Sequence, residues 1–199
     1  MEKSLKQGLK VDCLGLQYHV FIDNAQTLLD QGVQHSYYNP TRLFAIMDQY
    51  AKLDIPFNIS EITIPGCDKV GGDDMQAKIT ERLYRIWFSY PANSQIVWWN
   101  LVDGTAAYAP QGSNEGENGF KAGLLNYDFS HKPAYEVIKN LIHNEWTTNT
   151  TIKYEAEGVN KFHGFYGDYD IMIKTNNGEF KKTVFMYKRA LNNFKLELK

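Results

Sequence analysis

The 199-residue sequence predicts an α/β fold in which strand–helix units form a parallel sheet, followed by a small antiparallel β module. Three nearly continuous apolar stretches, each followed by a helical pattern, are typical of strands that are buried in a parallel sheet. From Thr147 onward, apolar and polar residues alternate instead, which is the pattern of antiparallel strands with one solvated face.

The first strand–helix unit follows residues 2–9, which are expected to be the end of an amphipathic helix that Gly8 stops. We expect a strand at residues 11–21 and a helix at residues 40–53, with Asn39 as its N-cap and proline at its first position. The apolar residues of this helix recur at a spacing of three and four, which predicts a buried stripe of Leu43, Ile46, Met47 and Tyr50.

The second and third units repeat this order. Residues 55–64, rich in β-branched side chains, predict a strand buried on both faces, and residues 75–90 predict a helix. The inward stripe of that helix comprises Ile79, Leu83, Ile86 and Trp87. The third strand is expected at 94–102, followed by a long loop at 104–122 and a final helix at 133–146.

The change of pattern near residue 147 predicts two domains, at 1–146 and 152–199, joined by a linker at 147–151. The second domain is expected to be a small antiparallel, sandwich-like β module. Its predicted strands are Thr151–Glu157, His163–Lys174, Lys182–Arg189 and Phe194–Leu198, with turns at 176–178 and 192–193.

Composition excludes several classes of function. The net charge of −2 and a pI near 6.2 argue against a nucleic-acid partner. No apolar run is long enough to span a membrane, and the N-terminus lacks the apolar centre of a signal peptide. The two cysteines, Cys13 and Cys67, have no metal-like spacing and are expected to be buried thiols. We therefore expect no metal and no cofactor.

Polar side chains collect at the carboxyl ends of all three predicted strands, namely Gln17 and His19, Glu61, and Asn100 and Asp103. In parallel α/β folds this edge of the sheet is where binding and catalytic sites are built. A carboxylate within an apolar strand is costly to bury without a partner. Glu61 is therefore either a structural carboxylate held by a partner or a functional one, and its placement favours function.

Taken together, these strand ends resemble glycoside hydrolase family 10, the endo-β-1,4-xylanases. The resemblance is carried by four segments in the family's order: Val11–His19, Ile55–Ile64, Val97–Gly104 and Gly123–Tyr135. They are similar to the sixth, seventh and eighth strands of that family's (β/α)8 barrel and to its closing stretch. The resemblance implies that residues 1–146 are the three C-terminal strand–helix units of such a barrel.

The resemblance further implies that Glu61 is the catalytic nucleophile of a retaining glycosidase. His19 would hydrogen-bond near Glu61 and keep it ionised and aimed, although a satisfied core histidine is the alternative. Gln17 would line the cleft and Trp99 would lie at the subsite beside the cleaved bond, whereas Trp98 would point to the opposite face and pack.

The loop after the third strand departs from the family pattern. Many members carry a second tryptophan over the sugar, where this chain has Ala107 with Tyr108 beside it. Tyr108 is therefore a candidate substrate contact. Asp103, Gln111 and Glu117 either contact substrate or shape the loop, and the sequence leaves both possibilities open.

The family's acid/base glutamate follows an asparagine at the end of the fourth strand, which this sequence does not contain. We therefore expect the N-terminal part of the barrel to be a required partner and the isolated chain to be inactive. The implied substrate is xylan or a related β-1,4-linked polysaccharide, and the implied location is secreted or bacterial cell-surface. Two alternatives are a non-catalytic carbohydrate-binding or interaction fragment and a β-glucanase of the same fold.

The β module carries a weaker signature, Phe162–Ile173, which resembles the small β-sandwich appended to some gut and rumen bacterial xylanases. Three of its aromatic side chains either form a sugar-stacking face or make up the module's own core and its contact with the barrel. We favour the second interpretation for Phe165, Tyr166 and Tyr169.

Overall fold

The computed structural model describes residues 2–21, 30–153, 155, 159–176, 178–188 and 190–196. Within it the chain divides into two compact units, Met1–Asn140 and Leu141–Lys199. The first contains, in chain order, α1 (Glu2–Lys6), β1 (Leu14–His19), α3 (Pro40–Ala51), β2 (Phe57–Thr63), α4 (Gly72–Ser89), β3 (Asn93–Trp98) and α5 (Pro133–Asn140). Short 3-10 turns lie between them at Gly32–Gln34 (η1), Ser36–Tyr38 (η2), Asp68–Val70 (η3) and Gly116–Phe120 (η4).

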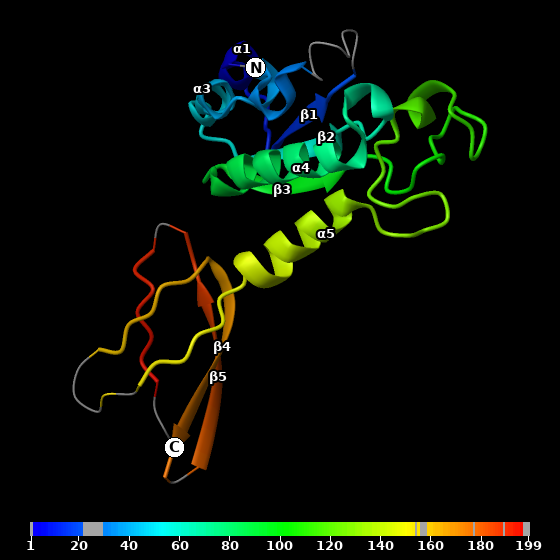
Figure 1. The fold of residues 1–199 in the computed structure, drawn as a ribbon. Coiled ribbons are helices and arrows are strands. Elements are labelled where there is room, and N and C mark those ends of the chain that lie inside the picture. Colours follow the sequence, from blue (N-terminus) through cyan, green and yellow to red (C-terminus); the bar gives the residue numbers. More distant parts are fainter. Residues whose placement is uncertain are drawn as a thin grey trace. The chain divides into compact units, whose positions relative to one another are not determined.

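The three strands of the first unit form one parallel sheet in the order β1-β2-β3 (Figure 1). This confirms the fold class predicted from the sequence. Because the strands are parallel, their carboxyl ends lie at one edge of the sheet. The long loop between β3 and α5 gathers at that edge, as Figure 1 shows. Among the described residues, β1 and β3 each pair with β2 alone, so each has one edge that the sheet leaves open.

Helix α4 covers one face of this sheet. Trp87 of α4 packs edge-on against Tyr18 of β1, with ring centroids 5.3 Å apart. Tyr84 of the same helix lies against Trp98 of β3, with centroids 6.4 Å apart. All four members of the predicted α4 stripe are buried, as are the β2 side chains on that face. Burying this stripe in an apolar layer is what holds the helix to the sheet.

The start of α3 is as predicted, because Asn39 caps it by accepting a hydrogen bond from the backbone N–H of Arg42. Its stripe is narrower than predicted. Leu43 and Met47 are buried, whereas Ile46 and Tyr50 remain 43% and 37% exposed. A spacing of three and four marks one side of a helix but cannot say how wide a strip the neighbouring elements cover.

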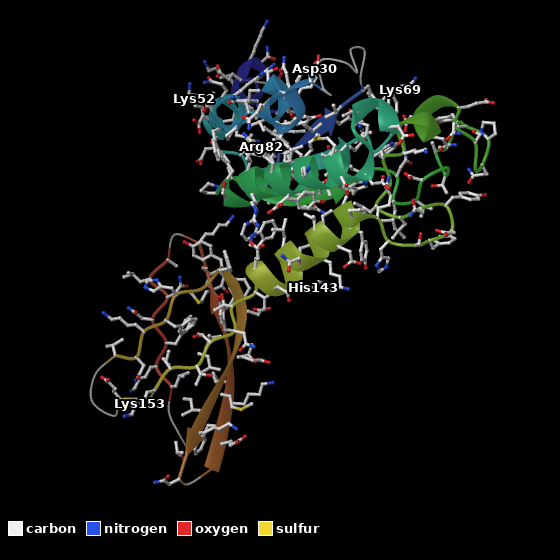
Figure 2. The ribbon with its side chains drawn as sticks, in the orientation of Figure 1. Asp30, Lys52, Lys69, Arg82, His143 and Lys153 are labelled. Atoms are coloured by element: carbon white, nitrogen blue, oxygen red, sulfur yellow. The ribbon has the colours of Figure 1, made fainter. Side chains whose placement is uncertain are left out.

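Helix α4 also holds the segment that precedes α3. Arg82, labelled in Figure 2, donates its Nε–H to the backbone carbonyl of Tyr38 at 2.7 Å. Tyr38 is itself 1% exposed. This contact joins η2 to α4 and fixes the connection that leads from β1 toward β2.

The opposite face of the sheet, which we call the polar face, carries small and polar side chains: Gly15, Gln17, His19, Asn58 and Ser60. A Cβ atom on Gly15 would lie 3.2 Å from the Ser60 hydroxyl, which shows that these two residues share that face. The expectation that the β2 strand is buried on both faces is therefore wrong for the described residues. Its α4 side is buried, whereas Asn58, Ser60 and Glu61 on the polar face are only partly buried.

The expectation of buried thiols is also corrected for one of the two cysteines. Both Cys13 and Cys67 are free, but Cys13 is exposed and Cys67 is partly buried. Cys13 stands just before β1, at the start of a strand that has one open edge. An apolar neighbourhood in the sequence did not reveal that this position lies outside the packed layer.

The second unit begins with a π-helical turn, η5 (Leu141–Glu145), and contains a hairpin of β4 (Gly167–Thr175) and β5 (Gly178–Met186). Thr175 pairs with Gly178, so the turn lies where Asn176 and Gly178 predicted it. Residues 151–153, 155 and 194–196 are not strands, which corrects the two outer predicted strands; their other residues lie outside the described ones. Alternation alone does not distinguish a paired strand from an extended segment.

Tyr169 of β4 is part of the interior of this second unit. Its hydroxyl donates to the Phe165 carbonyl at 2.7 Å and lies 2.9 Å from Thr148 Oγ1, and its ring contacts Phe162. Phe165 and Tyr166 stay 40% and 58% exposed. The packing role that we favoured is thus present for Tyr169, whereas Phe165 is partly covered and Tyr166 is more exposed than covered.

Candidate active site

Glu61 lies near the carboxyl end of β2, where the strand contains a β-bulge. Leu16 pairs with Ile59, but the next residue of β1, Gln17, pairs with Glu61, so Ser60 is an extra residue. Without the bulge, the alternation of side chains would turn Glu61 toward α4, as Ile59 is turned. The bulge instead directs Glu61 to the polar face and returns Ile62 to the dry side.

Two side chains of β1 hold the Glu61 carboxylate. The Gln17 amide Nε2 donates to Glu61 Oε1 at 3.0 Å, and His19 Nε2 lies 3.1 Å from Glu61 Oε2. An ionised carboxylate can only accept, so Nε2 of His19 must carry the hydrogen. The hydrogen bond expected between His19 and Glu61 is therefore present. The Glu61 side chain remains 28% exposed, which leaves it within reach of a ligand.

The orientation of the His19 ring is set by a residue that sequence reasoning missed. Nδ1 of His19 lies 2.7 Å from the hydroxyl of Thr63, which is 3% exposed at the end of β2. With the hydrogen on Nε2, Nδ1 accepts from the Thr63 hydroxyl. The signal available in the sequence was the position of Thr63, two residues after Glu61 and so on the same face of the strand.

Aromatic rings surround His19. Trp99, which follows β3, lies edge-on to the imidazole with ring centroids 6.1 Å apart, and Phe21 stacks on it at 5.0 Å. Trp99 and Phe21 are 39% and 44% exposed. Trp98 points the other way, as expected: it packs against the cluster of Ala77, Leu124 and Ala134, and its indole N–H donates to the Ala122 carbonyl at 2.9 Å.

The β3–α5 loop brings a second carboxylate to this region. Glu117 Oε2 accepts hydrogen bonds from Trp99 Nε1 at 3.0 Å and from Asn100 Nδ2 at 2.9 Å. A shallow pocket beside these residues is lined by Thr63, Asn100 and Glu117, among others. Glu117 thus belongs to the same constellation as Trp99, His19 and Glu61.

Two other predicted site residues are placed differently: Asp103 lines the same pocket but is held by other partners, and Tyr108 lies on the surface of the loop. Asp103 accepts from the backbone N–H of Gly123 at 2.7 Å and from Lys132 Nζ at 3.0 Å, so both of its oxygens are engaged. Lys132 is completely buried and also contacts Asp73. These contacts favour the loop-shaping alternative for Asp103. Tyr108 is fully exposed on the loop, at 104%.

The electrostatics of β1 reflect its two faces. Tyr18, between Gln17 and His19, points to the α4 side, and burial raises the pKa of its phenol well above the ordinary value. Tyr18 therefore stays neutral and serves packing. Among the described residues, no group of three His, Cys, Asp or Glu side chains is arranged to hold a metal ion. The helices within the described ranges include none long and apolar enough to cross a membrane.

A model of glycosyl hydrolase family 10 matches residues 1–141. The match spans all three strands, the β3–α5 loop and every residue of the constellation around Glu61. It ends one residue after the boundary between the two compact units.

Two solved xylanases resemble the chain in fold. For xylanase 10B from Thermotoga maritima the TM-score is 0.52, with 22% identity, over 72% of this chain and 40% of that one. For the N-terminal endo-1,4-β-D-xylanase 10B of Clostridium thermocellum, solved with xylohexaose, the TM-score is 0.50, with 17% identity, over 70% of this chain and 25% of that one. These similarities confirm the strand–helix units expected of part of a (β/α)8 barrel.

A curated relative, the anti-sigma-I factor RsgI6 of Acetivibrio thermocellus, is 28% identical over 180 residues. The similarity covers 89% of this chain and 20% of that protein. It therefore extends beyond the 141 residues of the family match. The chain spans about a fifth of the length of this curated relative.

Proposed function

Because this chain belongs to glycosyl hydrolase family 10, we propose that it supplies the nucleophile of a retaining endo-β-1,4-xylanase. The observation that carries the proposal is the pair of hydrogen bonds that Gln17 and His19 make to Glu61. Both donors fix the direction in which the carboxylate points. An ionised, aimed and accessible glutamate is what nucleophilic attack on a sugar requires.

In the proposed reaction, a Glu61 oxygen attacks the anomeric carbon of a xylose unit while the bond to the leaving sugar breaks. The leaving oxygen takes a proton from a second carboxyl group. Water then attacks the same carbon, the second carboxylate takes its proton, and Glu61 leaves as a carboxylate. The two inversions at the anomeric carbon give net retention of configuration.

Retention needs two carboxyl groups about 5 to 5.5 Å apart. We assign the acid/base to barrel units that would pair with the open edges of β1 and β3. The partner we propose is therefore the remainder of the barrel, and the proposed location is secreted or cell-surface. Gln17, Trp99 and Tyr108 are the proposed sugar contacts, whereas Asp103 acts by holding the loop.

The test uses a completed barrel, defined as this chain joined to the preceding strand–helix units of the Thermotoga maritima xylanase. Glu61→Ala is expected to lower xylan hydrolysis by about three orders of magnitude or more. Azide should restore turnover, because it can occupy the space that Glu61 leaves and attack the anomeric carbon in its place. This single displacement inverts the configuration at that carbon. The glycosyl azide should then have the α configuration. Unchanged turnover in Glu61→Ala, or a β-azide, would contradict the assignment.

A second candidate is carbohydrate binding without turnover, within a protein of another function. The similarity to a protein named as an anti-sigma-I factor, over 89% of this chain, favours it. The same completed barrel separates the candidates. Binding of xylohexaose without hydrolysis would support the binding role, and preference for a mixed-linkage glucan over xylohexaose would support the β-glucanase alternative.

A further inference from the structure

Glu117 uses a single oxygen to hold two side chains at the end of β3. Its Oε2 accepts from the indole N–H of Trp99 at 3.0 Å and from the amide of Asn100 at 2.9 Å. Its other oxygen makes no hydrogen bond to the described residues. The indole has only one N–H, so among the described residues this bond is the one hydrogen bond that holds the Trp99 ring.

The segment that carries Glu117 is itself anchored. The next residue, Asn118, is 4% exposed; its Oδ1 accepts from the Ala106 N–H at 2.9 Å and its amide donates to the Pro110 carbonyl at 3.1 Å. These two bonds tie η4 back onto the earlier part of the loop. Glu117 is therefore presented from a fixed backbone although its side chain is exposed.

Asn100 adds a second restraint at the same point. Its φ of 58° places it in the left-handed region, which asparagine tolerates better than most residues. The bond from its amide to Glu117 ties the loop to the chain immediately after Trp99. The two donors come from neighbouring residues and converge on one acceptor. The bond from Asn100 holds the backbone after Trp99 to the loop, and the bond from Trp99 holds the plane of the indole ring.

We propose that Glu117 is a positioning residue that sets the plane of the Trp99 ring, the platform on which the sugar stacks. It acts as a hydrogen-bond acceptor and not through its charge. The proposal rests on the proposed function, which places a sugar over Trp99. Both donors share Oε2 of Glu117, so the amide oxygen of glutamine can accept both bonds. The amide nitrogen would then take the place of Oε1, which accepts no hydrogen bond from the described residues.

The first test reads the indole N–H resonances of the full 199-residue chain without ligand, with Trp99→Phe identifying the Trp99 signal. Glu117→Ala should shift that signal and speed its hydrogen exchange about tenfold, since the N–H loses its hydrogen-bond acceptor. Glu117→Gln should change the exchange less than twofold. The matched control is Glu115→Ala, an exposed carboxylate on the same loop that makes no side-chain cap.

The second test measures binding of xylohexaose to the same variants made in the completed barrel. Glu117→Ala should weaken binding about tenfold, and Glu117→Gln should restore it to within about twofold of the original chain. The proposal is overturned if Glu117→Ala leaves the Trp99 signal unchanged, or if Glu117→Gln is as impaired as Glu117→Ala. A completed barrel that binds no xylohexaose, while the Trp99 signal of the chain still depends on Glu117, would support the positioning role and contradict the proposed function.

Discussion

Nε2 of His19 and Oε2 of Glu61 lie 3.1 Å apart across two parallel strands. The two residues are not register partners, because His19 pairs with Thr63 and Glu61 pairs with Gln17. The contact therefore depends on the bulge at Ser60, which turns Glu61 to the polar face. It also depends on Thr63, which holds the other ring nitrogen of His19 at 2.7 Å.

Loss of the His19 hydrogen bond should weaken the proposed nucleophile. In the completed barrel, we expect His19→Ala to lower kcat/KM on xylohexaose by about 10- to 100-fold, since a bond to a charged group contributes about 1.5 to 3 kcal/mol. His131→Ala is the matched control, because His131 is 47% exposed and its side chain contacts Glu136 and Tyr135 and not Glu61. A change of less than twofold in His19→Ala would show that the contact does not serve the reaction.

The neighbouring tryptophans should separate binding from folding. Trp99→Ala in the completed barrel is expected to weaken xylohexaose binding about tenfold with little change in the free energy of unfolding. Trp98→Ala should lower the free energy of unfolding by about 2 to 3 kcal/mol, because the part-buried ring leaves a cavity. Calorimetric titration measures the binding, and urea denaturation measures the free energy of unfolding. Weaker binding in Trp98→Ala together with lower stability in Trp99→Ala would contradict the placement of the two rings on opposite faces of the sheet.

The buried Lys132 should be a determinant of stability for the loop. Its ammonium group contacts Asp73 and Asp103 at 3.0 Å and the Lys121 carbonyl at 2.7 Å. Lys132→Met keeps the volume of the side chain but leaves two carboxylates facing an uncompensated site. We expect the free energy of unfolding of the completed barrel to fall by about 3 kcal/mol.

The control for this variant is Lys139→Met, since Lys139 is 54% exposed and lies 3.8 Å from its partner Glu136. Its removal should change the free energy of unfolding by less than about 0.5 kcal/mol. Equal effects in the two variants, measured by urea denaturation, would show that the Lys132 contacts contribute no more than a surface ion pair.

Local patterns predicted much of the fold. Three features depend only on residues that are near one another in the sequence, so the sequence alone could predict them. They are the apolar stretches of the three strands, the Asn39 cap and the buried stripe of α4. The placement of polar residues at the strand ends also predicted where His19, Glu61 and Asn100 would gather, because parallel strands end at one edge. The place of Trp99 beside them was implied by the family resemblance.

The remaining features depend on contacts between residues distant in the sequence. The extra residue at Ser60 is visible only once β1 and β2 are paired. The engagement of Asp103 depends on Lys132, which lies 29 residues further along the chain. The acceptor role of Glu117 likewise depends on a loop that folds back to Trp99, 18 residues earlier. None of these pairings follows from periodicity or composition.

Trapping the glycosyl-enzyme tests the role of Glu61 most directly. A 2-deoxy-2-fluoro xylobioside with a dinitrophenolate leaving group needs no acid to depart, and fluorine slows the release of the sugar from the carboxylate. After incubation with the completed barrel, peptide mass spectrometry should find the sugar on the peptide that contains Glu61, and Glu61→Gln should abolish the adduct. Attachment to another carboxylate such as Glu117, or no adduct on a barrel that hydrolyses xylan, would contradict the assignment.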